Sequence, residues 1–203
     1  MATRMASLEY IDPLALQELL WPDVQFYPEQ EEIIYSVLDN DETVVVAANQ
    51  VGKDYVAGYV CVWFFLSAIK TGHTCRVVTT SVRDDHLRIL WAEIGRFVTS
   101  ASSPLVYPHG PLVMNFHEIR RAEELESRNP VNYMVGMVSK KGEGMAGHHA
   151  EHTLLVGDEA SGLDEQVYDQ GRTWAKKILL FGNPNPCTNF FQRAVKVGNL
   201  IGV

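Results

Sequence analysis

A short apolar strand that leads through a glycine turn into a long apolar helix constrains this chain more than any other feature. The strand is predicted at Thr43–Ala48, the turn at Asn49–Gly52 and the helix at Lys53–Ile69. The most apolar part of that helix, Val56–Ile69, has 14 residues, whereas a membrane span needs roughly 20. It is better explained as a helix buried inside a globular fold.

Strands alternate with helices along the rest of the chain. Further strands are predicted at Cys75–Thr80, Thr153–Val156 and Lys177–Phe181, with extended segments near Leu112–Phe116 and Asn132–Val138. Further helices are predicted at Pro13–Leu20, Pro28–Leu38, Arg83–Val98, Asp164–Trp174 and from about Asn189. This alternation implies an α/β fold, with a mainly parallel sheet covered by helices on both faces. We expect one domain over residues 1–203, with residues 1–40 as a helical lead-in and residues 41–203 as the core.

Charge and cysteine content limit the classes of partner and compartment. The chain has 17 Lys and Arg against 25 Asp and Glu, a net charge of −8. Any binding of DNA must therefore use a local basic surface, and we expect it to be weak and strongly salt-dependent. Three scattered cysteines without a Cys-x-x-Cys pair fit a reducing compartment. The N-terminus lacks the pattern of a signal peptide, and no membrane contact is expected.

The glycine turn has the layout of a phosphate-binding loop. In such loops, backbone N–H groups before a helix converge on phosphate oxygens, and a lysine, here Lys53, neutralises the β and γ phosphates. The turn that would bind the nucleotide consists of Ala48, Asn49, Gln50, Val51 and Gly52. The motif is incomplete, because Ala47 replaces its first glycine and Asp54 its hydroxyl residue. Taken alone, an ordinary glycine turn before a buried helix would explain this segment as well.

A second apolar strand ends in two acids, Asp158 and Glu159. In magnesium-dependent hydrolysis of ATP, Asp158 would hold Mg²⁺ and Glu159 would orient or deprotonate the attacking water. The alternative is a solvated acid pair at a strand end. Both segments in this order predict a site for ATP and Mg²⁺. Asn183, after the strand Lys177–Phe181, would reach the same sheet edge and sense the γ-phosphate, unless its Gly-Asn-Pro sequence only forms a turn.

Together these residues resemble the ATPase part of large terminase subunits, the motors that package DNA into tailed-phage heads. The resemblance covers residues 26–197, in the segments FYPEQEEII, VVTTSVRDDHLRILWAEI, GMAGHHAEHTLLVGDEASG and LLFGNPNP followed by NFFQRAV. The motifs are individually loose and jointly specific. The resemblance implies a RecA-like P-loop fold with an additional strand. Family members usually continue into a nuclease domain, whereas this sequence ends at Val203. We therefore expect no DNA cutting from this chain.

The resemblance also implies roles for individual residues. Gln30 would bind the adenine edge, with Tyr27 or Phe26 as a stacking surface. By the same resemblance, the catalytic residues would be Lys53, Glu159 and Asn183, with Asp158 on Mg²⁺. Gly182-Asn183-Pro184 resembles the motif that couples hydrolysis to movement.

The implied partners are double-stranded DNA, the portal and the small terminase subunit. The chain would form a ring when assembled and a monomer in isolation. It would act in the cytoplasm of the bacterial host and transiently at the procapsid portal.

Two positions depart from the family pattern. Asp54 stands where Ser or Thr binds the metal; its carboxylate could bind Mg²⁺ directly or through water, but adds negative charge beside the triphosphate. Weaker ATP affinity or stronger metal dependence is expected. Many terminases have an arginine finger where this chain has Glu143-Gly144. The remaining candidates, each also explained as a surface charge, are Arg83, Arg120, Arg121, Arg128, Lys140 and Lys141.

Other interpretations stay open at this point. A helicase-like DNA-dependent ATPase shares the glutamine, the lysine loop and the acid pair, but needs a second RecA-like domain. A nucleotide-binding module silenced at Asp54 is a third possibility. The cluster His148-His149-x-x-His152 has a spacing that zinc can use, yet no fourth ligand is near. Trp63, Phe64 and Phe65 are expected in the core and not on a base-stacking surface.

Overall fold

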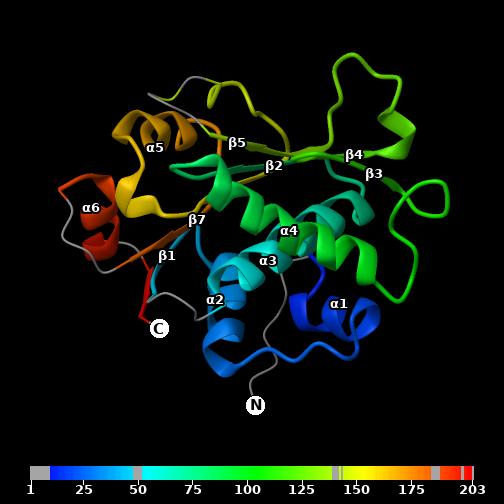
Figure 1. The fold of residues 1–203 in the computed structure, drawn as a ribbon, viewed down its shortest axis with the longest axis horizontal. Helices are drawn as coiled ribbons and strands as arrows, with labels where there is room; N and C mark the ends of the chain where they lie inside the picture. Colours follow the sequence, from blue (N-terminus) through cyan, green and yellow to red (C-terminus); the bar gives the residue numbers. More distant parts are fainter. Residues whose placement is uncertain are drawn as a thin grey trace.

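A mainly parallel sheet of eight strands forms the centre of the protein, with the order β3-β4-β5-β2-β6-β7-β1-β8 (Figure 1). The computed structural model describes residues 10–47, 52–138, 142, 144–183, 188–197 and 199–202. The strands are β1 Glu42–Val46, β2 Cys75–Thr80, β3 Leu112–Asn115, β4 Glu118–Arg121, β5 Tyr133–Met137, β6 His152–Gly157, β7 Lys177–Gly182 and β8 Asn199–Gly202. Neighbouring strands are parallel throughout the stretch β5-β2-β6-β7-β1-β8 of this sheet. Only the pairs β3–β4 and β4–β5 are antiparallel. The predicted mainly parallel sheet is confirmed, whereas β4 and β8 have no counterpart among the predicted elements.

Helices cover both faces of this sheet, as predicted. They are α1 Pro13–Leu20, α2 Pro28–Asp39, α3 Lys53–Lys70, α4 Asp84–Ser100, α5 Glu165–Gly171 and α6 Phe190–Val197, with short 3-10 turns at Ala122–Glu124 and Ala160–Gly162. Successive strand residues point to opposite faces: Val45 packs into a core with α1 to α4, and Val44 into a second core with α5 and α6. No helix of the described residues is long and apolar enough to cross a membrane.

Helix α3 is buried almost all round, between the sheet and helices α1, α2 and α4 (Figure 1). Trp63, Phe64 and Phe65 are fully buried, which confirms them as core residues. The indole of Trp63 donates a hydrogen bond to the carbonyl of Ile11 at 2.8 Å, and the Tyr59 hydroxyl donates one to the carbonyl of Pro13. The two polar tips thereby tie the start of the chain onto this helix.

Gly58 is the one glycine within α3, and it lies where α3 and α4 come closest. A Cβ atom added to Gly58 would lie 2.9 Å from Cβ of Glu93 and 3.1 Å from the backbone of Glu93 and Ile94. These neighbours are mostly main-chain atoms, which cannot rotate away. The glycine therefore sets the distance between the two helices, and with it the position of the first turn of α4.

We predict that Gly58→Ala destabilises the protein by about 1–3 kcal/mol, because overpacking outweighs the gain in helix propensity. Gly95→Ala in α4 is the matched control: a Cβ there meets only the flexible Met114 side chain at 3.8 Å. This control should stabilise by about 0.5–1 kcal/mol. Urea unfolding of the three proteins measures both effects. Equal changes in the free energy of unfolding for Gly58→Ala and Gly95→Ala would contradict the close approach of α3 and α4.

Candidate functional site

Four of the predicted site residues lie at the carboxyl ends of three neighbouring strands, β6, β7 and β1. Lys53 begins α3 beyond β1, Asp158 and Glu159 follow β6, and Asn183 follows β7. The N–H of Ala47 donates to the carbonyl of Gly182 at 3.1 Å, which keeps the ends of β1 and β7 level. In parallel α/β sheets, ligands bind at this edge.

Lys53 forms the electrostatic centre of the site. Its Nζ lies 3.1 Å from Oδ1 of Asp158 and donates a hydrogen bond to Oε1 of Glu159. Burial lowers the pKa of Lys53, but the hydrogen bond to Glu159 and the charge of Asp158 outweigh burial and raise the pKa overall. Asn183 completes the group, since its Nδ2 donates to the other Glu159 oxygen at 3.0 Å. The structure thus brings together residues from three segments that are far apart in the sequence.

Asp158 is the most buried acid of the site, with 3% of its surface exposed. Its N–H donates to the carbonyl of Thr80 at 2.9 Å, and Ser81 Oγ donates to its Oδ2 at 3.3 Å. Its Oδ1 faces Lys53 but accepts no hydrogen bond from the described residues. Ser81 was not among the predicted site residues, although it directly follows the predicted strand Cys75–Thr80.

The backbone at Glu159 is in the left-handed region, with φ 51° and ψ 41°. This conformation costs a non-glycine residue of order 1 kcal/mol and persists only where the surroundings fix it. The following turn is fixed by Asn189, whose Nδ2 donates to the carbonyls of Ser161 at 2.9 Å and Leu163 at 3.1 Å. Asn189 was not predicted as part of the site; it acts on the acid only through this turn.

Asp54 lies in the first turn of α3, close to the other acids. Burial raises the pKa of its carboxyl to about 6, the negative charge of Asp158 adds to this, and Lys53 opposes it. Three carboxylates therefore face one lysine in this group. The carboxylate at the hydroxyl position therefore lies close to two other acids.

Of the residues predicted to lie beside the adenine, Phe26 is the one that the structure places elsewhere. Tyr27 is 72% exposed and free to stack on a ligand, whereas Phe26 is buried against Tyr55 and Tyr59. Phe26 as a stacking surface is therefore wrong, because its ring belongs to the core. Gln30 Oε1 accepts a hydrogen bond from the N–H of Tyr27 at 3.1 Å.

The Gln30 side chain also lies against the glycine turn. A Cβ at Gly52, whose φ is 76°, would lie 3.0 Å from Nε2 of Gln30. Alanine at this position would therefore be disfavoured by backbone conformation as well as by the contact. Ala48, Asn49, Gln50 and Val51 lie outside the described residues, as do Lys140, Lys141, Glu143 and Pro184.

The other candidate arginines and the histidine cluster have separate surroundings. Arg83 pairs with Asp85, Arg120 with Glu118 and Arg121 with Glu123, and Arg128 is exposed. His148 bonds Tyr133 Oη at 2.7 Å, while His152 bonds Tyr10 Oη at 2.6 Å and lies in β6. The imidazole rings of His148 and His152 therefore form hydrogen bonds with different residues.

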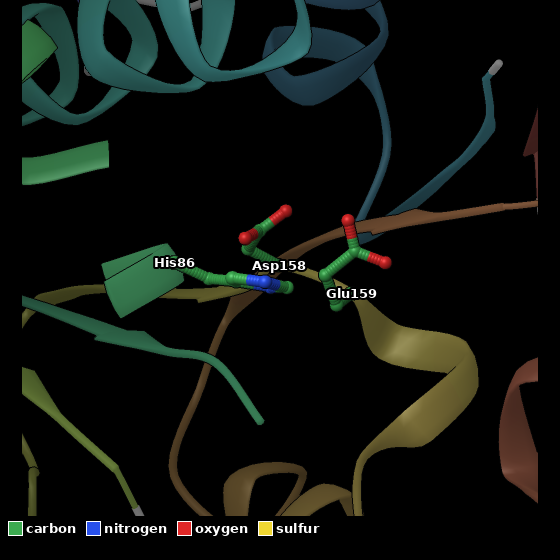
Figure 2. A group of neighbouring side chains, drawn as sticks. All are labelled: His86, Asp158 and Glu159. Atoms are coloured by element: carbon green, nitrogen blue, oxygen red, sulfur yellow. The ribbon is translucent and has the colours of Figure 1, made fainter. Parts of the chain in front are cut away.

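His86, in the first turn of α4, is a site residue that the sequence analysis did not find. One ligand atom each from His86, Asp158 and Glu159 lie within 4.8 Å of one another. Figure 2 shows the His86 ring extending from α4 toward the two acids. His86 precedes Asp158 by 72 positions, and only the pairing of β2 with β6 brings them together. The donor set, with its buried Asp158 Oδ1, fits a divalent cation.

The structure is similar to solved ATPase domains of phage large terminases. The HK97 bacteriophage large terminase matches 98% of this chain and 43% of its own, with a TM-score of 0.65 and 12% identity. A variant of the Thermus phage P74-26 ATPase domain matches 88% and 72%, with a TM-score of 0.64 and 15% identity. The large terminase of a thermophilic bacteriophage, solved in complex with ADP, matches 88% and 45%, with a TM-score of 0.57 and 14% identity.

The chain therefore has the RecA-like fold of phage large-terminase ATPase domains, as predicted. Its sequence matches no protein-family profile and no curated protein. The chain spans less than half of the HK97 large terminase and of the large terminase solved with ADP. At such low identities the likeness concerns the fold.

We predict a pH-dependent gain in stability for Asp54→Asn. The folded-state pKa of Asp54, about 6, lies above its ordinary 3.8, so the folded state holds this proton more tightly than the unfolded state. Wild-type stability then falls as pH rises from about 4 to about 6. The variant should be more stable above pH 6, by roughly 1 kcal/mol after allowance for solvent screening, and no more stable below pH 4.

Thermal unfolding between pH 4 and pH 8, without magnesium, measures this difference. The matched control is Asp23→Asn, because Asp23 is exposed in the connection between α1 and α2. A gain for Asp54→Asn that is equal at every pH would contradict the charge origin of the effect.

Proposed function

We propose that this chain is the ATPase domain of a phage large terminase, which couples hydrolysis of ATP to movement of double-stranded DNA into a procapsid. The observation that carries the proposal is the group of Lys53, Asp158, Glu159 and Asn183 at the carboxyl edge of the sheet. The fold supports it, as do the ADP and ATP-γ-S bound to the similar large terminase of the thermophilic phage. We propose residues 1–203 as one P-loop ATPase domain.

The nucleotide would bind with its phosphates at the N-terminus of α3. The helix N-terminus and the Lys53 ammonium favour negative phosphate groups there. Lys53 would exchange its contact with the two acids for the β and γ phosphates. Gln30 and the exposed Tyr27 would lie on the adenine side, since the Gln30 amide adjoins Gly52. Buried Phe26 has no part in this binding.

Glu159 would act as the general base for the attacking water. A carboxylate freed from Lys53 accepts a proton more readily, and Asn183 would hold its other oxygen in place. Mg²⁺ would neutralise charge on the phosphates, with Asp158, and Asp54 beside it, as the residues that hold it. Because Asn183 follows β7 and bonds the base, a change at Glu159 would be transmitted to the segment before α6.

The partners remain those that the resemblance implies. We propose weak, transient contact with double-stranded DNA, assembly into a ring on the portal, and contact with the small terminase subunit. The place of action would be the cytoplasm of the bacterial host. The chain's net charge of −8 supports a transient grip on DNA and not a permanent one.

One observation favours a second candidate, a nucleotide-binding module without turnover. Asp54 places a third carboxylate beside the phosphate loop, and its burial together with the charge of Asp158 raises its pKa. Such a site would bind ATP without positioning the metal for hydrolysis. No contact in the described residues favours the helicase-like alternative.

We predict that Glu159→Gln lowers kcat for ATP hydrolysis by at least about 100-fold while leaving nucleotide affinity within a few-fold, because the amide cannot accept the water proton. Glu126→Gln, in the exposed connection between β4 and β5, is the matched control. Steady-state hydrolysis is measured with and without duplex DNA, at protein concentrations high enough for a ring. Nucleotide binding without turnover under every condition would favour the silent module.

We predict that Asp54→Thr raises affinity for ATP by about tenfold and lowers the magnesium requirement, because one negative charge leaves the phosphate loop and a metal-binding hydroxyl replaces it. Calorimetric titration with ATP-γ-S over a series of magnesium concentrations measures both. Asp54→Asn separates the two causes, since it removes the charge without adding the hydroxyl. Unchanged affinity and unchanged magnesium requirement in Asp54→Thr would show that Asp54 does not influence the site.

A further inference from the structure

We propose that His86 supplies a nitrogen ligand to the divalent cation of this site, so that the site takes transition-metal ions such as Mn²⁺ in preference to Mg²⁺. The inference rests on the proposed function, since it concerns the cation that accompanies the nucleotide. It adds a ligand and a metal preference that neither Asp158 nor Asp54 implies.

The position of His86 is fixed by the fold. β2 and β6 are neighbours in register, with Thr80 opposite Gly157, so that the residues after the two strands begin at the same level. The N–H of Asp158 donates to the carbonyl of Thr80 at 2.9 Å. The first turn of α4 follows within a few residues and directs the imidazole at the acids (Figure 2).

Within the described part of the chain, the ring of His86 has the carboxylate of Asp85 as a charged neighbour. It makes no hydrogen bond there, and its neighbour Asp85 is paired with Arg83 at 2.6 Å. The ring is half-buried, so that part of its solvent shell is already lost. A ring nitrogen within 4.8 Å of two carboxylate oxygens is therefore available to a shared ion.

The charge of the group independently points to a dication. Asp54, Asp158 and Glu159 face the single ammonium of Lys53, which leaves two negative charges in excess. Lys53 contacts both Asp158 and Glu159, the place where a cation would bridge them. The buried Oδ1 of Asp158 accepts no hydrogen bond from the described residues. When Lys53 turns to the phosphates, this oxygen needs another positive partner.

The chemistry of the ligands sets the preference of the site for Mn²⁺ over Mg²⁺. Mg²⁺ selects oxygen ligands and keeps much of its water, whereas imidazole suits Zn²⁺, Cu²⁺, Fe²⁺ and Ni²⁺. Mn²⁺ is the weakest binder of that first-row series, but it accepts an imidazole more readily than Mg²⁺ does. One imidazole and two carboxylates form a mixed set that Mn²⁺ accepts readily. A site of oxygen ligands alone would distinguish the two ions much less.

Pulsed electron paramagnetic resonance of Mn²⁺ bound to the full chain tests the proposal, with Mn²⁺ alone and with Mn²⁺ and ADP. The expected result is a ¹⁴N coupling from one imidazole, which changes to the ¹⁵N pattern when the unmutated chain is labelled with ¹⁵N-histidine. His86→Ala should lose the coupling and bind Mn²⁺ at least about tenfold more weakly, with a smaller loss for Mg²⁺. His109→Ala, at an exposed histidine between α4 and β3, should retain it.

Bound Mn²⁺ without nitrogen coupling, or coupling that persists in His86→Ala, would overturn the inference, as would equal losses of Mn²⁺ and Mg²⁺ affinity. Absence of Mn²⁺ binding at millimolar concentration would overturn it as well. The labelled unmutated chain still shows whether a histidine nitrogen binds the ion if His86→Ala fails to fold. If ADP fails to bind, the proposed function is the part that fails; if ADP binds and the nitrogen coupling is absent, only the role of His86 fails.

Discussion

Burial of helix α3 on every side is the constraint on which the rest of the structure depends. A helix that is apolar all round cannot face water, and here the sheet covers it on one side and α1, α2 and α4 on the others. The start of the chain and the first residue of α1 are also held by this helix, through hydrogen bonds from Trp63 and Tyr59. Because this helix cannot shift without uncovering its core, its first turn is held at the sheet edge. Lys53 is therefore presented to the acids from a rigid element.

Local patterns predicted much of this arrangement. β2 and α1 were predicted with the bounds that the structure gives them, since most residues of Cys75–Thr80 are β-branched and Pro13–Leu20 has helical periodicity between breakers. The acids and Asn183 were predicted because each ends an apolar strand. Local patterns suffice where a segment lies between clear breakers and its residues favour one kind of element.

Other parts depend on contacts that no local pattern records. β4, with the sequence EIRR, carries charge and has only one buried side chain, because it pairs at the edge region of the sheet. β8 is an edge strand whose only pairing partner within the described residues is β1. His86 belongs to an amphipathic helix whose pattern explains it as an ordinary exposed position, and only the β2–β6 register brings it to Asp158. Phe26 was placed beside the nucleotide by sequence neighbourhood, but its ring points into the core.

The charges of the site explain why an aspartate in the first turn of α3 is compatible with folding. Three carboxylates and one ammonium are unfavourable in a partly buried group, and the raised pKa of Asp54 records that cost. Lys53 offsets part of it by contacting two acids at once. In the proposed function, phosphates alone would add to the negative charge, so a nucleotide bound here would need a cation to accompany it. On that proposal, an aspartate at position 54 would link ATP binding to metal binding more tightly than a hydroxyl, because neither the anion nor the acids would be neutralised without the ion.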